Sequence, residues 1–135
     1  MEAKNSFDFP FTLTARAENF VHGRLDMDDT IRRLQAFQEA GADVLYAPDL
    51  RSREDISAVV RSLGKPVNVM IGASLTVSEL AEIGVKRISL GSTLVRASLG
   101  ELLRAAEEIK DKGTYAFVEQ AVPFNTLTEI FRKPN

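Results

Sequence analysis

The 135-residue chain has no cysteine and a single histidine. The absence of cysteine excludes disulfides, thiolate zinc sites and a cysteine nucleophile, and it fits a reducing compartment. No apolar run approaches the length of a signal-peptide core or a membrane span. We therefore expect a cytoplasmic protein that has no membrane partner.

A basic excess is also missing, because 17 Lys and Arg residues face 19 Asp and Glu residues and leave a formal net charge of -2. The composition therefore carries no electrostatic signature of nucleic-acid binding. Small acidic ligands that bind at a local basic site remain possible.

Four short apolar runs alternate with amphipathic stretches of helical period. We expect strands at 11–15, 43–46, 66–70 and 87–90, and helices at 28–40, 52–63, 76–83 and 92–112. Apolar strands that are each followed by a helix are typical of an α/β fold with a parallel sheet. The pattern leaves two completions open, a small open α/β domain and half of an eight-fold βα barrel.

We expect residues 1–135 to form a single domain, with βα units over about 11–112. The tail over about 114–135 is too apolar to be free in water, so it should pack on the core or on a partner. A half-barrel also leaves strand edges unpaired, and such edges attract partners. The chain should therefore form a homo-oligomer, a dimer or larger.

Several polar residues have a local explanation. Ser92 lies where the last long helix begins, and we interpret it as a helix cap although a helix N-terminus can also hold an anion. The helix dipole explains Asp26, Asp28 and Asp29 at a helix start, so no metal is assigned to them. His22 lies in a polar loop and is interpreted as a surface residue.

Arg16 is the first candidate site residue, because it lies where an apolar strand ends. In a βα-repeat protein a charged side chain at a strand's carboxyl end faces the ligand crevice, where a guanidinium can bind a carboxylate with two parallel hydrogen bonds. The alternative is an ion pair with Glu18.

Asn68 is the second candidate, since it lies inside an apolar strand. A buried amide must find hydrogen-bond partners. It therefore either bonds the neighbouring backbone or faces the crevice.

Four segments then match a known pattern in order, with the spacing of that pattern: residues 12–18, 28–43, 65–69 and 80–89. Together they resemble the isocitrate lyase and phosphoenolpyruvate mutase family. The resemblance covers about residues 11–110 and corresponds to the second half of that family's TIM-type (β/α)8 barrel.

The resemblance implies a C–C bond lyase or decarboxylase that acts on a small α-keto or hydroxy di- or tricarboxylic acid. Arg16 matches the family arginine that binds the substrate's acidic group, and Asn68 matches a strand-end asparagine that hydrogen-bonds substrate. Residues 46–48 read Tyr-Ala-Pro where the mutases place a histidine, which disfavours mutase chemistry.

The family also implies Mg²⁺. Its metal ligands and its acid/base loop lie before the matched segment, so this chain supplies no identifiable metal ligand and its catalytic residues are unknown. The alternative is a truncated, non-catalytic half-barrel that serves as a binding or oligomerisation module.

Overall fold

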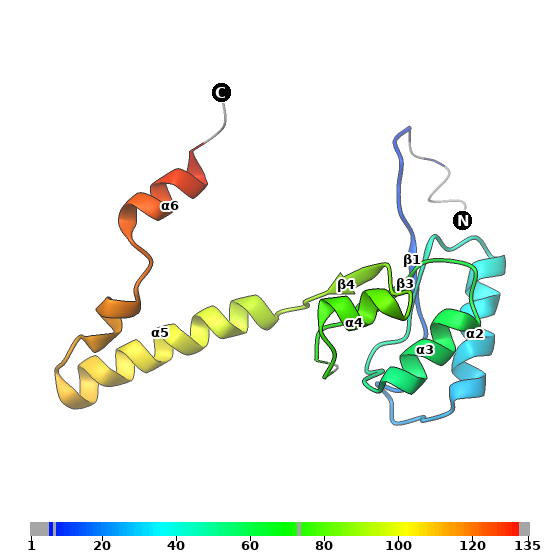
Figure 1. The fold of residues 1–135 in the computed structure, drawn as a ribbon, viewed down its shortest axis with the longest axis horizontal. Coiled ribbons are helices and arrows are strands. Elements are labelled where there is room, and N and C mark those ends of the chain that lie inside the picture. The colour runs from blue at the N-terminus through cyan, green and yellow to red at the C-terminus, as the bar shows by residue number, and fades with distance from the viewer. Residues whose placement is uncertain (1–5, 7, 73, 133–135) are drawn as a thin grey trace. The chain divides into compact units, whose positions relative to one another are not determined.

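The structure is a computed structural model that describes residue 6, residues 8–72 and residues 74–132. Two compact units make up the chain, Met1–Gly91 and Ser92–Asn135. The first unit holds the strands and the second is helical (Figure 1). That residues 1–135 form one domain, with the tail packed on the core or on a partner, stays a prediction.

The first unit alternates strands and helices. Its elements are β1 (Thr14–Arg16), α2 (Met27–Glu39), β2 (Val44–Tyr46), α3 (Arg53–Arg61), β3 (Val67–Met70), α4 (Val77–Glu82) and β4 (Arg87–Ser89). Neighbouring strands pair in parallel, in the order β1-β2-β3-β4. The predicted βα repeats with a parallel sheet are confirmed.

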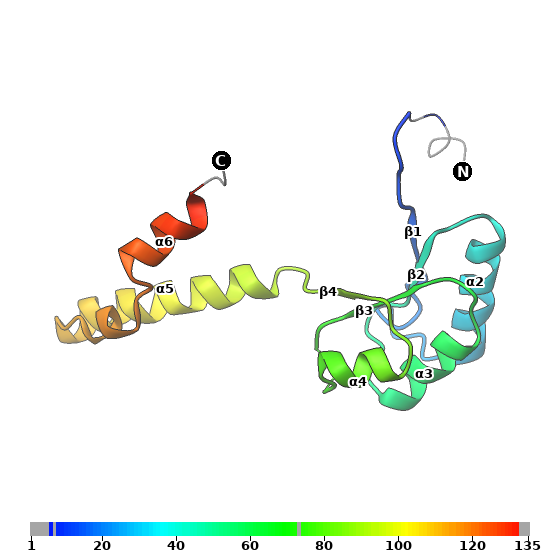
Figure 2. The same cartoon turned by 45° about the horizontal axis from the view of Figure 1, so that its top comes forward.

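The helices of this unit cover one face of the sheet, and Figure 2 shows α3 and α4 beneath β3 and β4. Leu45 of β2 and Val69 of β3 enter one apolar core with Leu34 of α2, Ile56 of α3 and Leu80 of α4. Leu34, Leu45 and Ile56 are 0% exposed. Side chains alternate along a strand, so the residues on either side of Leu45 and Val69 face away from the helices.

Side-chain caps start the three helices of this unit. In α4, Thr76 and Glu79 form the reciprocal capping box that their spacing predicts. In α3, the Ser52 hydroxyl accepts from the backbone N of Asp55 at 3.0 Å. α2 begins at Met27, one residue before the predicted start at residue 28, because Asp26 is its N-cap.

β1 differs from the predicted strand at 11–15, since it begins later and includes Arg16. Pairing needs an opposite backbone, and Thr14 lies opposite Val44, the first residue of β2. Just before β2 the chain still turns out of α2 through Gly41, whose φ is 96°. The stretch before Thr14 is instead held by Asp43, whose carboxylate accepts from the backbone N of Leu13 at 2.8 Å.

The second unit contains α5 (Thr93–Lys112), the 3-10 helix η1 (Ala116–Gln120) and α6 (Phe124–Phe131). α5 ends at Gly113, whose φ of 65° is the left-handed conformation that favours glycine. Within the described residues, no helix of the chain is long and apolar enough to cross a bilayer.

Glu108 of α5 holds the start of the tail. Its carboxylate accepts from the Thr114 hydroxyl at 2.6 Å and from the backbone N of Ala116 at 2.8 Å and of Phe117 at 3.3 Å. These bonds lower the pKa of Glu108, the hydroxyl bond most. The Glu108 carboxylate thus holds the first residues of the tail against α5.

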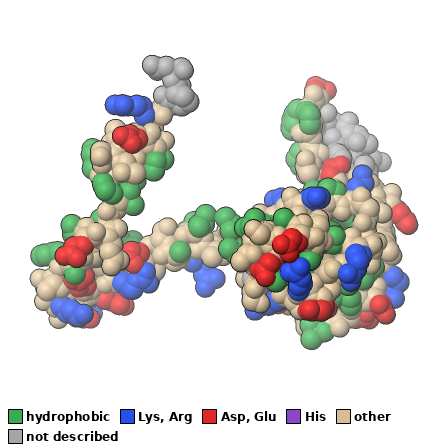
Figure 3. Space-filling model, viewed as in Figure 1, with side chains coloured by type: hydrophobic (Ala, Val, Ile, Leu, Met, Phe, Trp, Pro, Cys, Tyr) green, Lys and Arg blue, Asp and Glu red, His purple; other side chains and the backbone are tan. Residues whose placement is uncertain are grey.

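Apolar side chains lie exposed along the second unit (Figure 3). The most exposed include Leu94, Val95, Leu102 and Leu103 of α5, and Phe124, Ile130 and Phe131 of α6. No residue of α5 is buried. An apolar surface of this extent is typical of a protein interaction site.

The interpretation of Ser92 as a side-chain cap is wrong. Ser92 occupies the N-cap position of α5, but its side chain makes no capping hydrogen bond. Its φ of -88° and ψ of 7° depart from the extended conformation that Ser52 and Thr76 adopt at their caps. An N-cap hydroxyl usually reaches the first helical turn from that extended conformation.

Truncation of the core should be far more costly than truncation of the surface. We expect Leu34→Ala to lower the free energy of unfolding by about 2–5 kcal/mol, because it leaves a cavity under the sheet. Leu25→Ala is the control, since Leu25 is 75% exposed. Chemical denaturation measures both; equal, small losses would contradict the core assignment.

Candidate functional site

One register row of side chains crosses the sheet on the face opposite α2, α3 and α4. Arg16 pairs with Tyr46, Tyr46 with Asn68, and Asn68 with Arg87. Register partners in a parallel sheet point to the same face, and the core-facing Leu45 neighbours Tyr46 in sequence. The row of Arg16, Tyr46, Asn68 and Arg87 therefore shares the opposite face, and we call it the register row.

Arg16 lies at the end of β1, as the site prediction requires. Its guanidinium carbon is 5.1 Å from the centroid of the Tyr46 ring, a cation–π contact that holds the side chain on this face. The Arg16 Nε also lies 2.7 Å from the Glu18 Oε1, and the two side chains are 53% and 38% exposed. The ion pair that the sequence offered as the alternative is thus present, but an exposed pair contributes little and can yield to a ligand carboxylate.

Asn68 is 1% exposed, and its amide is satisfied by side chains. Arg87 Nη1 donates to Asn68 Oδ1 at 2.8 Å, and Asn68 Nδ2 donates to Ser89 Oγ at 3.0 Å. The expected partners of the buried amide therefore come from β4. That Asn68 contributes to a ligand site stays a prediction.

Sequence reasoning did not single out Arg87 and Ser89, the hydrogen-bond partners of Asn68. They lie two apart on β4, so both point to the face of the register row. The signal was present as polar residues at alternate positions of a predicted strand. Only the register of β3 and β4, which places Arg87 opposite Asn68, shows that these residues lie on one face with Asn68.

The loop after Arg16 is fixed to α2 by Asp29. The Asp29 Oδ2 accepts from Asn19 Nδ2 at 2.7 Å and from Arg33 Nε at 2.6 Å. These bonds, that of Arg33 most strongly, lower the pKa of Asp29 to about 2. The loop that carries Glu18 is thereby held beside Arg16. His22 of the same loop is exposed, as expected.

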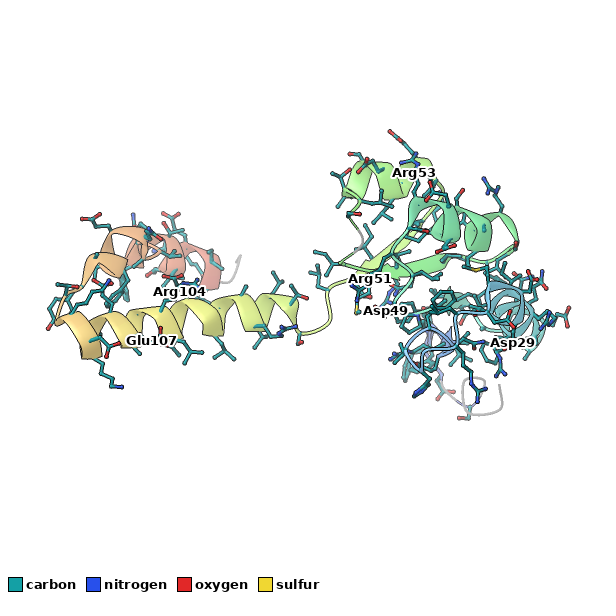
Figure 4. The ribbon with its side chains drawn as sticks, turned by 90° about the horizontal axis from the view of Figure 1, so that it is seen from below. Asp29, Asp49, Arg51, Arg53, Arg104 and Glu107 are labelled. Atoms are coloured by element: carbon teal, nitrogen blue, oxygen red, sulfur yellow. The ribbon has the colours of Figure 1, made fainter. Side chains whose placement is uncertain are left out.

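The acids near the strand ends are engaged elsewhere. Asp26 caps α2, and Asp29 holds Asn19 and Arg33. Asp49, which follows β2, lies 2.7 Å from Arg51, and Figure 4 shows this pair side by side. Among the described residues, no group of three or more His, Cys, Asp or Glu could hold a metal ion. The described residues therefore form no ready cluster of metal ligands.

Comparison with known proteins identifies the family. The family model described as phosphoenolpyruvate phosphomutase matches residues 1–110. The chain belongs to the phosphoenolpyruvate phosphomutase family. The predicted resemblance is confirmed, and the four-stranded sheet is part of this family's barrel-like fold.

Relatives within the phosphomutase family include solved structures and enzymes. A candidate lyase/mutase from Burkholderia cenocepacia J2315 is 50% identical and superposes with a TM-score of 0.91, over 99% of this chain and 49% of that one. Oxaloacetate acetylhydrolase is 25% identical with a TM-score of 0.76, over 94% and 46% of the two chains. Phosphonopyruvate hydrolase of Variovorax sp. (strain Pal2) is 30% identical over 122 residues, which cover 86% of this chain and 42% of that protein. The chain thus spans less than half the length of these relatives.

Asp29 should give the fold a pH-dependent contribution. A carboxyl whose folded pKa is lowered to about 2 stabilises the folded state above its ordinary value of 3.8, and loses that effect as the pH falls toward 2. Asp29→Asn should therefore lower the Tm at pH 7, with the difference shrinking between about pH 4 and pH 2. Thermal unfolding across this range measures it.

Asp28→Asn is the control for that measurement. Asp28 is an exposed acid in the same first turn of α2, so it shares the effect of the helix dipole. A loss for Asp28→Asn as large as that for Asp29→Asn would attribute the effect to the dipole and not to the loop contacts.

Proposed function

We propose that this chain supplies the substrate-anion-binding half of a C–C bond lyase or decarboxylase. The substrate class is a small α-keto or hydroxy di- or tricarboxylic acid. Arg16 carries the proposal, because it is the last residue of a parallel strand, on the face opposite α2, α3 and α4, and its guanidinium lies over the Tyr46 ring. The names of two relatives, oxaloacetate acetylhydrolase and phosphonopyruvate hydrolase, support an α-keto acid with a second acidic group, which is a carboxylate in oxaloacetate and a phosphonate in phosphonopyruvate.

In this proposal the guanidinium of Arg16 binds a substrate carboxylate through two parallel hydrogen bonds. The carboxylate takes the place of Glu18 in the pair that the structure shows. The fixed positive charge also orients the substrate and stabilises negative charge that develops as a bond breaks. No step is assigned to a metal ion, because the described residues identify no set of metal ligands.

A second candidate function rests on the exposed apolar surface of α5 and α6. There Leu102 and Leu103 are each 63% exposed and Phe124 is 86% exposed. We propose that this surface makes the chain a homo-oligomer, as a binding or oligomerisation module would require. The two functions are compatible, since the anion site lies in the first unit.

The anion proposal makes a direct prediction for Arg16. Arg16→Ala should weaken binding of oxaloacetate by about 10- to 100-fold, the worth of one to two charge-assisted hydrogen bonds. Arg16→Lys should recover part of the loss, since lysine keeps the charge but not the planar fork. Isothermal calorimetry measures both, and Arg61→Ala on the exposed face of α3 is the control.

If Arg16→Ala and Arg16→Lys bound as tightly as the unmodified chain while Asn68→Ala lost binding, the site would lie on β3. If the unmodified chain bound no dicarboxylate, the anion proposal itself would be wrong.

The assembly proposal predicts a dimer or larger species at micromolar concentration. Leu103→Glu places a charge on the exposed apolar surface of α5 and should shift the chain toward monomer. Leu25→Glu, at a site that is 75% exposed in the first unit, should not. Light scattering coupled to gel filtration measures the mass; a stable monomer for the unmodified chain would contradict the proposal.

A further inference from the structure

A series of side-chain hydrogen bonds links β3 to β4 on the face of the sheet that carries Arg16. Arg87 donates to Asn68, and Asn68 donates to Ser89. Arg87 and Asn68 belong to the register row, and Ser89 lies one step closer to the carboxyl end of β4 on the same face.

The donors and acceptors of these hydrogen bonds follow from the chemistry of the groups. A guanidinium has donors and no acceptor, so the group 2.8 Å from it must be the amide oxygen of Asn68. The amide nitrogen is then obliged to face Ser89. A flipped amide would oppose donor to donor in a site where Asn68 is 1% exposed.

Ser89 is the last residue in this series of hydrogen bonds, and its hydroxyl can still donate one. Its oxygen accepts from Asn68, and among the described residues its hydroxyl donates to no acceptor. The residue opposite Ser89 is Met70, which is 38% exposed and offers no strong acceptor. The hydroxyl proton is therefore available on the ligand face.

We propose that Arg87, Asn68 and Ser89 form a directional relay that presents the Ser89 hydroxyl as a donor to an acceptor oxygen of the substrate. The relay rests on the proposed function. Ser89 is the ligand-binding residue, and Arg87 is a positioning residue that acts through the amide of Asn68. Each donated bond polarises the next, so the charge of Arg87 strengthens the donor at Ser89.

The relay defines what the ligand offers at this point. A second acidic group or a keto oxygen can accept the hydroxyl proton of Ser89, whereas an ammonium has no acceptor for it. The Ser89 donor is neutral and Arg16 is charged. The site thus selects a molecule with a carboxylate for Arg16 and a further acceptor oxygen for Ser89.

Oxalate is a suitable probe, since both of its ends are acceptors. By calorimetry, Ser89→Ala should weaken oxalate binding by about ten-fold, the worth of one hydrogen bond to a charged group. Ser89→Thr keeps the hydroxyl and should restore most of the affinity. Ser78→Ala, at an exposed serine of α4, is the matched control.

The role of Arg87 has its own readout. Arg87→Met should weaken oxalate binding and shift the side-chain amide NMR signals of Asn68, which Asn68→Asp identifies by their loss. Arg87→Lys restores a charged donor and should return both toward the unmodified values. A residue with a merely structural role would lower the Tm without this paired recovery.

The outcomes separate the two proposals. If the unmodified chain binds no oxalate, the proposed function fails and the relay falls with it. If the unmodified chain binds oxalate and Ser89→Ala binds equally well, the relay alone is overturned. If Arg87→Met leaves the Asn68 amide signals unchanged, Arg87 does not position the amide.

Discussion

The parallel register of four short strands is the constraint on which the site depends. Thr14 pairs with Val44, which defines the register of β1 and β2. The pairings of β2 with β3 and of β3 with β4 define the register of the other strands. Burial of Leu45 beneath the sheet then decides which face is apolar, because a shift by one residue would exchange the two faces. The polar side chains of the other face come together as a result of this burial.

The site carries two guanidinium groups, and each has a different neighbour. Arg16 lies beside a partly exposed acid, Glu18, and on the ring of Tyr46, so it can exchange Glu18 for a ligand carboxylate at small cost. Arg87 is bonded to the buried amide of Asn68. The exposed Arg16 is thus suited to binding a ligand, and Arg87 is suited to holding the Asn68 amide in one orientation.

Local signals in the sequence were enough for much of the fold. Thr76 and Glu79 lie three residues apart, so their capping box needs no tertiary structure, and apolar periodicity located the helices and strands. Ser92 shows the limit of such signals. It is a serine at a helix start, as Ser52 is, but its backbone adopts a conformation that does not support side-chain capping.

The candidate site was predicted in part. Arg16 was placed at its strand end from the sequence, whereas the partners of Asn68 lie 19 and 21 residues away on β4. No local pattern reports a contact across that separation, because it depends on the register of two strands. Likewise, the late start of β1 follows from where its partner strand begins.

The central claim is that the register row forms a face that binds a small dicarboxylate. A titration of the 15N-labelled chain with oxalate, followed residue by residue in NMR spectra, tests it most directly. The account predicts saturable shifts at the backbone amides near Arg16, Tyr46 and Ser89. Shifts that concentrate in α5 and η1, or none at saturating oxalate, would contradict it.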